Sequence, residues 1–405
     1  MTRRTTLPLL LCGFSRKLSA QDWPQFRGPD GQGHSNERAL PLTWSERENV
    51  RWKVPIPGRG WSSPAILGNH IWLTTATGGG RSLNAICLDR DSGRQRQAVE
   101  LFHVGDAEHI NGKNSYASPT PLLEGDSVYL HYGPYGTACI RNSGELVWKT
   151  RLKYSPEHGP GGSPVLFEDL LIISCDGQDV QYVVALDKTT GKIRWKTSRD
   201  GYQAYTTPLV IEAAGRTQLI SPGAHRAIAY DPRTGKEIWW VRYGQGFSNV
   251  PRPVFGAGLV FLCTGFFEPL VLAVRPDGKG DVTGSHVAWT LKRGAPLTPS
   301  PLLVGDELYV VSDNGIATCL DAKTGNPHWR ERLGGNFSAS PVSAGDRIYF
   351  LNEDGQTTVI ASGTQFQKLA TNQLDGGTLA SIAVSAGAIF IRTHENLYRL
   401  EQPSK

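Results

Sequence analysis

The sequence predicts an all-β fold, an eight-bladed β-propeller of four-stranded antiparallel blades that is closed by an N-terminal strand in the last blade. Three observations predict this fold. A marker that usually combines a small residue with proline recurs at intervals of 40 to 55 residues, each marker leads into short β-rich runs, and a turn of the form Asp-x-x-Thr-Gly with a tryptophan four residues later ends several repeats. Self-similarity of this length, with about four short strands per repeat, is typical of propeller blades.

The first 20 residues predict an export signal (residues 1–20). A charged start at Arg3–Arg4 precedes an apolar run, Leu7–Phe14, and an acceptable cleavage site, Leu18–Ala20. The apolar run is far shorter than the roughly 18 residues that a bilayer-spanning helix needs. We therefore expect an exported, soluble periplasmic protein without a membrane span. A lipid anchor at Cys12 is less favoured, and the choice between the general and the twin-arginine export routes stays open.

Charge and cysteine content argue against several partners and sites. Four of the 42 basic residues lie in the leader, so the rest of the chain carries 38 basic against 37 acidic residues. This balance does not suit a nucleic-acid partner, which would need a clustered basic face. Cys87, Cys139 and Cys319 occupy one repeated strand position on separate repeats, so we expect buried free thiols and no disulfides. No cysteine or histidine spacing typical of zinc occurs, and the sequence predicts no metal site.

The arm and the propeller follow the leader. Residues 21–48 form a predicted N-terminal arm, and residues 49–405 form a single propeller. Its blades begin at eight markers, of which the last is degenerate: Ser63–Pro64, Ser118–Pro119, Ser163–Pro164, Thr207–Pro208, Arg252–Pro253, Ser300–Pro301, Ser340–Pro341 and Ser381–Ile382. The last repeat, 380–400, has three strands, and the missing strand matches Asn49–Val54. We therefore expect this N-terminal strand, with Trp52, to complete the last blade and to leave no open sheet edge.

A tryptophan motif links the repeats to a known family. It is complete in Ala229–Trp239, whereas in the first repeat Gln97 replaces the tryptophan. This motif resembles the tryptophan-docking repeat of quinoprotein (PQQ) propellers. The segment Asp22–Gly31 resembles the start of exported PQQ-like repeat proteins of planctomycete-type bacteria, and the repeats are distantly similar to the outer-membrane assembly propeller lipoprotein of Gram-negative bacteria. The resemblance implies the propeller fold and leaves function open, because this fold carries both dehydrogenases and non-catalytic scaffolds.

One face of the predicted ring collects the candidate functional residues. We expect the marker strand of each blade to lie innermost, so that loops between blades and turns between second and third strands share one face, named here the loop face. Aromatic, histidine, arginine and amide side chains that converge at a channel mouth suit a ligand or a partner. The candidate binding residues are Trp61, His109, Asn111, Asn114, Tyr116, Tyr135, His158, Asp176, Asp179, Tyr205, His225, Arg226, Asn249, Arg252, Phe266 and Phe337.

Local patterns single out two parts of this face. The first repeat contains an insertion, 103–115, and loops on a rigid scaffold often carry function, so His109, Asn111 and Asn114 lead the candidates. Asp176 and Asp179 could offer carboxylates to calcium. A hairpin turn is the favoured interpretation of this segment, because other repeats carry Asp-Gly or Asn-Gly turns at equivalent positions.

The sequence favours a non-catalytic binding or scaffold protein that uses its loop face. No nucleophile elbow, phosphate loop or zinc-protease motif is present. We expect a monomer that binds a protein, glycan or small-molecule ligand and needs no cofactor.

The alternative that the resemblance implies is a PQQ-dependent alcohol or sugar dehydrogenase, with PQQ and calcium as cofactors. Such enzymes usually carry calcium ligands, a catalytic aspartate and a disulfide between adjacent cysteines, whereas the nearest cysteines after the leader are Cys139 and Cys175. A third interpretation, a membrane-anchored assembly factor, would need lipidation at Cys12. The sequence leaves the identity of the ligand open.

Overall fold

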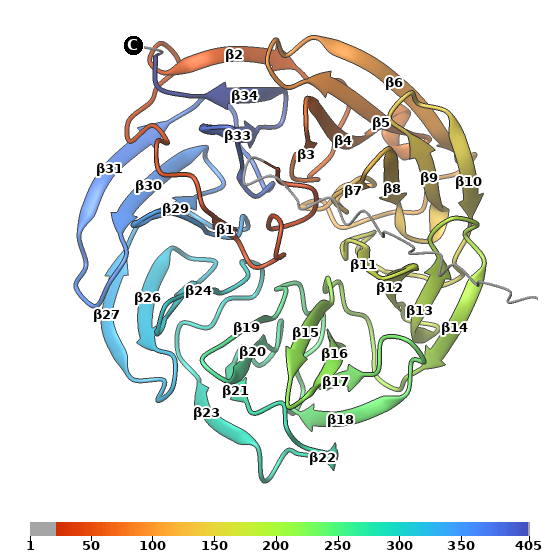
Figure 1. Ribbon diagram of the computed structural model, residues 1–405, viewed down its shortest axis with the longest axis vertical. Coiled ribbons are helices and arrows are strands. Elements are labelled where there is room, and N and C mark those ends of the chain that lie inside the picture. Colours follow the sequence, from red (N-terminus) through yellow and green to blue (C-terminus); the bar gives the residue numbers. More distant parts are fainter. Residues whose placement is uncertain (1–21, 404–405) are drawn as a thin grey trace, which may run out of the picture.

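Eight sheets surround a central axis in the computed structural model, which describes residues 22–403 (Figure 1). The predicted export signal and Cys12 lie outside the described residues. Each sheet is built on four antiparallel strands, and the strand that follows its marker lies nearest the axis. The prediction of an eight-bladed all-β propeller is therefore confirmed. None of the helices within residues 22–403 has the length and apolar character that crossing a bilayer requires.

The strands follow the chain blade by blade. Blades 1 to 4 consist of β3 (Ala65–Leu67), β4 (His70–Thr77), β5 (Ser82–Asp89) and β6 (Gln95–His103); β7 (Leu122–Glu124), β8 (Ser127–His131), β9 (Thr137–Arg141) and β10 (Leu146–Thr150); β11 (Val165–Phe167), β12 (Leu170–Asp176), β13 (Gln181–Asp187) and β14 (Ile193–Ser198); and β15 (Leu209–Ala213), β16 (Arg216–Pro222), β17 (Arg226–Tyr230) and β18 (Glu237–Arg242).

Blades 5 to 8 consist of β19 (Val254–Gly256), β20 (Leu259–Cys263), β21 (Val271–Val274) and β23 (Val287–Leu291); β24 (Leu302–Val304), β25 (Glu307–Val311), β26 (Ile316–Asp321) and β27 (Pro327–Arg332); β28 (Val342–Ala344), β29 (Arg347–Leu351), β30 (Gln356–Ala361) and β31 (Lys368–Gln373); and β32 (Ala383–Ser385), β33 (Ala388–Arg392), β34 (Asn396–Leu400) and β2 (Val50–Pro55). The short strands β1 (His34–Ser35) and β22 (Gly280–Asp281) extend blades 7 and 4, and two short 3-10 helices are η1 (Gly78–Gly80) and η2 (Gly133–Tyr135).

The hydrophobic pattern of a strand determines its position in the blade. The middle strands β12 and β13 are apolar and buried along most of their length, since neighbouring blades cover both of their faces. The outer strands β14 and β2 instead alternate half-buried with exposed residues over most of their length. The cysteines of the described chain are buried and unpaired, as predicted: Cys87, Cys139, Cys175, Cys263 and Cys319.

Outer-strand tryptophans join neighbouring blades. Trp195 of β14 donates its indole N–H to the Pro232 carbonyl, in the turn of the next blade, at 2.9 Å. Its ring lies against Gly235, where φ is 70° and an added Cβ would come within 2.5 Å of the ring, so this turn requires glycine. Trp239 departs from the pattern, because it donates to Gln218 Oε1 of its own blade at 2.7 Å. Equivalent bonds to the next blade are made by Trp148, Trp289 and Trp329.

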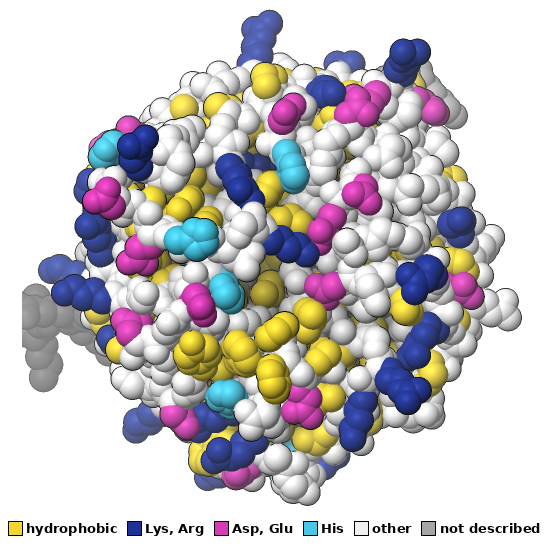
Figure 2. Space-filling model, turned by 180° about the vertical axis from the view of Figure 1, so that it is seen from behind, with side chains coloured by type: hydrophobic (Ala, Val, Ile, Leu, Met, Phe, Trp, Pro, Cys, Tyr) yellow, Lys and Arg dark blue, Asp and Glu magenta, His cyan; other side chains and the backbone are white. Residues whose placement is uncertain are grey.

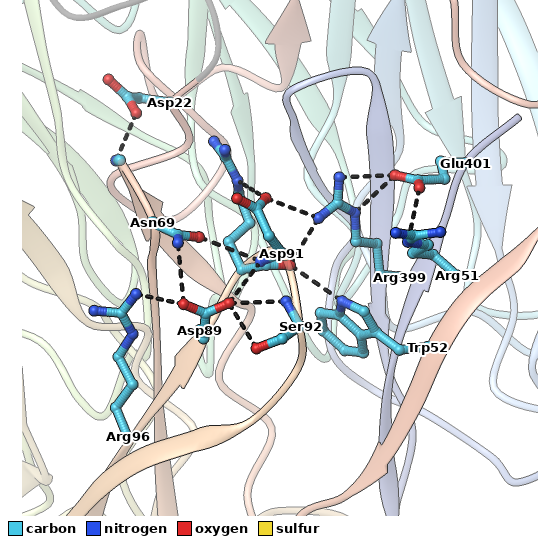
Figure 3. A network of polar contacts seen from close by, with 12 residues as sticks. Asp22, Arg51, Trp52, Asn69, Asp89, Asp91, Ser92, Arg96, Arg399 and Glu401 are labelled. Carbon is cyan, nitrogen blue, oxygen red and sulfur yellow. Dashed lines mark hydrogen bonds and ion pairs between the residues drawn. The ribbon is translucent and has the colours of Figure 1, made fainter. Parts of the chain in front are cut away.

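The N-terminal strand β2 closes the ring as predicted. It pairs antiparallel with β34, so that Trp52 stands opposite Arg399. The Trp52 indole N–H donates to the Arg90 carbonyl of blade 1 at 3.1 Å, and the Arg399 guanidinium donates to the same carbonyl at 2.9 Å (Figure 3). Arg399 also pairs with Asp91 at 3.0 Å. Residues 309 positions apart therefore hold blade 8 against blade 1.

A ring of marker residues surrounds the axis. The backbone N–H of a marker residue donates to the side-chain hydroxyl of the marker residue in the next blade, at 2.8 to 3.2 Å, wherever that residue carries a hydroxyl. These hydroxyls, named here the hydroxyl ring, belong to Ser63, Thr120, Ser163, Thr207, Ser300, Ser340 and Ser381. The second marker is thus Thr120–Pro121, and the prediction of Ser118–Pro119 is wrong by two residues, because β7 begins at Leu122. Arg252 takes the remaining position and interrupts the ring.

The N-terminal arm, residues 22–48, crosses the end of the channel that lies opposite the loop face (Figure 1). Trp23 forms an antiparallel bridge with Ile66 of blade 1, and β1 pairs in parallel with β28 of blade 7. Trp23, Leu40 and Trp44 are buried in the core between blades. The arm is therefore packed into the folded body and reaches blades on both sides of the axis.

Candidate functional site

A cavity of about 810 Å³, named here the funnel, opens on the loop face. Its wall is formed by loops that connect neighbouring blades, and its inner end contains the hydroxyl ring and Phe26 of the arm. Figure 2 shows this face, with hydrophobic side chains gathered beside a central hollow. The volume falls within the range of about 300–1,000 Å³ that is usual for ligand pockets. The funnel is thus the natural candidate for a binding site.

Part of the wall is aromatic and backed by cationic groups. Trp61 donates its indole N–H to the Lys113 carbonyl at 3.0 Å, and its ring centroid lies 4.8 Å from that of His394. The Arg59 guanidinium lies 5.4 Å from the Trp61 ring. Burial and the charge of Arg59 lower the pKa of His394. The predicted residues that line the funnel are Trp61, Asn111, Asn114, His158, Tyr205 and Phe266.

The insertion after β6 folds over the rim of the funnel. Asn114 fastens it to the next interblade loop by donating its amide to the His158 carbonyl at 2.6 Å. Tyr116 and Tyr135 pack against each other at a centroid distance of 5.9 Å beneath the insertion and do not line the funnel. His109 is exposed and also lies outside the lining. The insertion therefore contributes amide groups to the funnel and keeps its histidines outside it.

A second cluster lines the wall between blades 3 and 4. The Tyr205 hydroxyl oxygen accepts the backbone N–H of His158 at 3.3 Å, and the two rings lie 5.8 Å apart. Gln203 donates its amide to the Ser248 hydroxyl at 3.3 Å. Burial raises the pKa of Tyr205, so its hydroxyl stays protonated at neutral pH. These side chains offer hydrogen-bonding groups beside aromatic faces.

An aromatic patch, defined as Tyr202, Phe247, Phe266 and Phe267, continues the wall onto the outer surface. The Phe247 ring contacts the other three at centroid distances of 5.7 to 6.3 Å. Phe266 and Phe267 are 54% and 71% exposed. Phe267 has a φ of 79°, which is rare for a bulky residue. Sequence reasoning missed the roles of Phe247, Gln203 and Lys113, because single residues in interblade loops give no periodic signal.

Several predicted site residues are buried and do not line the funnel. Asn249, Arg252 and Phe337 are at most 3% exposed. Asp176 is 1% exposed, and the Arg199 guanidinium binds both of its carboxylate oxygens. Because these oxygens are occupied, Asp176 does not offer them to calcium. These four residues therefore lie in the interior, where they pack or bond to neighbouring segments, and they do not contact a ligand in the funnel.

The other predicted residues outside the lining bond to neighbouring loops. Asp179 accepts the backbone N–H of Ser155 at 2.8 Å, and His225 Nδ1 lies 3.2 Å from the Gly244 carbonyl oxygen. Arg226 forms an ion pair with Asp200 and lies over the ring of Trp240. These contacts stabilise the rim that surrounds the funnel.

Two buried guanidinium groups, which do not line the funnel, lie behind its inner end. Arg252 donates to the Phe26 carbonyl at 2.7 Å, and Arg27 donates to two carbonyls of blade 6. Burial, together with the charge of Arg252, lowers the pKa of Arg27 to about 9, and burial lowers that of Arg252 to about 10. The charge of Asp30 acts on both groups, but its carboxylate bonds to His34 at 2.6 Å. The cations therefore outnumber the carboxylates here.

The funnel does not provide the donor set that calcium requires. Calcium takes about six to eight oxygen ligands, among them carboxylates. Two carboxylates line the funnel, Glu157 and Asp313, and they come from different loops. Asp313 already accepts the backbone N–H of Leu297 at 2.7 Å. Across residues 22–403, no group of three or more His, Cys, Asp or Glu residues could hold a metal ion. The residues present therefore do not fit the calcium ion of the dehydrogenase alternative.

Comparison with known proteins assigns the repeats to a family. A family model described as outer membrane protein assembly factor BamB matches residues 137–213, 182–266 and 280–394, which is more than half of the chain. A protein of the same description from Burkholderia pseudomallei (strain K96243) is 31% identical over 242 residues, which cover 54% of this chain and 57% of the relative. The match thus spans little more than half of the relative's length.

Solved structures share the fold at low sequence identity. BamB from Moraxella catarrhalis has a TM-score of 0.62 at 13% identity, over 87% of this chain and 99% of that one. The quinohemoprotein alcohol dehydrogenase from Comamonas testosteroni has a TM-score of 0.68 at 10% identity, over 95% and 81%. These likenesses concern the fold alone. With the family match, the repeat motif and the eight-bladed ring in agreement, the chain belongs to the PQQ-like propeller family of the outer membrane protein assembly factor BamB.

Proposed function

We propose that this chain is an exported, non-catalytic binding protein whose funnel and aromatic patch hold an extended segment of a partner polypeptide. The observation that carries the proposal is the aromatic patch, which continues from the funnel wall onto the exposed surface. Contiguous exposed apolar groups of this kind are uncommon on monomeric proteins and mark interaction sites.

The composition around the patch suits a polypeptide. Val250, beside Phe247 in the same loop, is 37% exposed and adds aliphatic surface. Gln203 and Asn111 offer amide groups that can bond to peptide groups. Lys113 lies in the lining and pairs with Glu353 at 2.6 Å. An apolar centre within a polar rim is the usual anatomy of a protein interface.

The relative from Burkholderia pseudomallei supports a polypeptide over a glycan or a small molecule. Its description names the assembly of outer membrane proteins, which are polypeptides. The same description, together with the signal pattern in residues 1–20, supports export to the periplasm.

The test removes the exposed rings and leaves the core intact. The double variant Phe266→Ser, Phe267→Ser is compared with Ile193→Ser, which removes a 56% exposed apolar side chain of β14. Each protein is immobilised, and retention of a pool of short random peptides is measured by mass spectrometry. We expect the unmodified chain and Ile193→Ser to retain peptides, and the double variant to retain about tenfold less, because central aromatic residues dominate binding. Equal retention by all three proteins would contradict the proposal.

The dehydrogenase alternative is tested on the same purified chain. PQQ and calcium are added, and dye reduction is followed with a panel of alcohols and aldoses. Saturable binding of PQQ accompanied by turnover would replace the binding-protein proposal with an enzyme.

A further inference from the structure

The inner end of the funnel carries hydroxyl groups that can still donate a hydrogen bond. In the hydroxyl ring each oxygen accepts a backbone N–H from a neighbouring blade. Among the described residues, no acceptor is present for five hydroxyl protons of the ring, those of Ser63, Thr120, Ser163, Thr207 and Ser381. These side chains line the funnel and are at most 6% exposed. A group that enters from the loop face and meets them must be a hydrogen-bond acceptor.

Positive charge surrounds the same ring. Arg252 takes the position without a hydroxyl, and Arg27 lies next to it. Arg392 approaches the ring at blade 1, where it donates to the Ser62 hydroxyl at 2.7 Å and to the Thr74 carbonyl at 2.9 Å. All three guanidinium groups are buried, and burial lowers the pKa of Arg392 to about 9. Within residues 22–403 their hydrogen bonds go to carbonyl and hydroxyl oxygens. A buried cation without a paired anion is costly, so an anion at the ring would be stabilised.

The carboxylates of the funnel do not supply that anion. Asp313 bonds to the backbone N–H of Leu297 at 2.7 Å and of Thr298 at 3.3 Å. Glu157 is an exposed residue of an interblade loop. The hydroxyl ring therefore combines hydrogen-bond donors with nearby positive charge. The carboxylates that line the funnel pair with neither the hydroxyl groups nor the guanidinium groups.

We propose that the hydroxyl ring is a carboxylate-binding subsite, and that the polypeptide held in the funnel enters with its C-terminal carboxylate at the ring. This inference rests on the proposed function, since it assigns an orientation to the same ligand. A carboxylate accepts several O–H donors at once, and such charge-assisted bonds are stronger than neutral ones. Sites that capture the C-terminus of a chain use arrays of donors in this way. A peptide is favoured over a sugar acid because the exposed apolar side chains of Val250 and Phe266 line the funnel and suit apolar side chains of a peptide.

Two pools of short peptides with the same random sequences test the subsite on the unmodified chain. One pool ends in a free carboxylate and the other in a carboxamide. We expect the acid pool to be retained about tenfold more, because the amide loses the charge-assisted bonds. Equal retention of the two pools would overturn the subsite and leave the proposed function standing. Retention of neither pool would overturn both the subsite and the proposed function. Oligogalacturonate, a sugar acid, is applied to the same chain as a third probe, and its retention without retention of the peptides would overturn the peptide assignment.

Variants assign the effect to the ring. The double variant Ser163→Ala, Thr207→Val removes two donors, and Ser338→Ala is the matched control, because Ser338 lines the funnel but donates to Glu353 at 2.6 Å. We expect the ring variant to lose its preference for the acid pool and the control to keep it. The removed hydroxyls also accept backbone N–H groups, so a melting curve checks that the ring variant is folded. A folded ring variant with an unchanged acid preference would overturn the subsite.

Discussion

At the scale of single residues, burial determines what Asp176 can do. Its side chain and that of Arg199 are each 1% exposed, and Arg199 Nε donates to Asp176 Oδ1 at 2.8 Å. Burial raises the pKa of Asp176, and the charge of Arg199 offsets only part of that effect. Arg199 also donates to the Ser221 carbonyl of blade 4 at 3.0 Å. The pair therefore bridges two blades.

We expect Asp176→Ala to lower the free energy of unfolding by about 3–5 kcal/mol, because it leaves the buried Arg199 unpaired. The double variant Asp176→Leu, Arg199→Met should recover most of this loss, since it removes both charges. Asp200→Ala, at a pair with Arg226 in which Asp200 is 76% exposed, should cost less than about 1 kcal/mol. Denaturant unfolding followed by tryptophan fluorescence compares the variants. Equal losses in Asp176→Ala and Asp200→Ala would contradict the role of the buried pair.

At the scale of elements, the N-terminal arm is held in part by a histidine between two acceptors. His34 Nδ1 lies 2.6 Å from Asp30 Oδ2, and His34 Nε2 lies 2.6 Å from the Leu303 carbonyl oxygen of blade 6. Only the protonated imidazole donates to both. Burial by itself lowers the pKa of His34, and the charge of Arg27 acts in the same direction. The hydrogen bond and charge of Asp30, together with the bond to the Leu303 carbonyl, outweigh these effects and raise the pKa above 6.5.

The arm should be held more weakly as the pH rises. Because the pKa of His34 is raised in the folded state, its contribution to stability is fully present below pH 6.5 and is lost as the pH rises through the raised pKa. The difference in Tm between the unmodified chain and His34→Asn should therefore be larger at about pH 5.5 than at about pH 9. His328→Asn, on the exposed strand β27, is the matched control for the substitution. A difference that does not depend on pH would contradict this interpretation.

At the scale of the whole molecule, ring closure depends on a strand from the N-terminal side. β2 covers the edge of β34, and Trp52 packs against Phe390 at a centroid distance of 5.9 Å. The neighbouring arm adds Trp23 and Trp44 to the core between blades. Ring closure by β2 and docking of the N-terminal arm therefore contribute separately to the stability of the fold, and truncated chains can distinguish the two contributions.

We expect a chain that begins at Glu46 to keep the closed ring, and one that begins at Gly60 to open or aggregate. The second chain lacks β2 and exposes the edge of β34. Loss of a fully buried tryptophan side chain typically costs about 3–5 kcal/mol. Trp52 is half-buried, so loss of its side chain costs less than this, and loss of the strand adds to it. The first chain lacks most of the arm, so it should melt below the full chain and remain monomeric. Light scattering and thermal melting measure both properties, and equal Tm values for two monomeric truncated chains would show that the ring closes in another way.

The sequence by itself determined the features that local pattern controls. The spacing of the markers determined eight blades, and the three-stranded last repeat determined the closure by Asn49–Val54. Strand order then located the loop face and, with it, Trp61 and Asn114 in the funnel. The blades were predictable because most neighbouring strands of a blade are also neighbours in the chain, so a short window of sequence contains their turns and their hydrophobic alternation. The closure was predictable because the last repeat lacks one strand and the segment before the first marker supplies one.

Apart from the closing strand, contacts between distant segments were decided only by the tertiary structure. Arg27 of the arm donates to the Pro301 carbonyl, 274 residues away, and no local sequence pattern predicts that contact. The structure also turned Asp176 inward to Arg199, brought Phe247 into the aromatic patch, and selected Thr120 over Ser118 for the hydroxyl ring. The physical reason is that the direction of a side chain, and a shift of one or two residues at a marker, depend on the packing of one blade against the next. The repeat pattern specifies each blade and leaves that packing to the assembled ring.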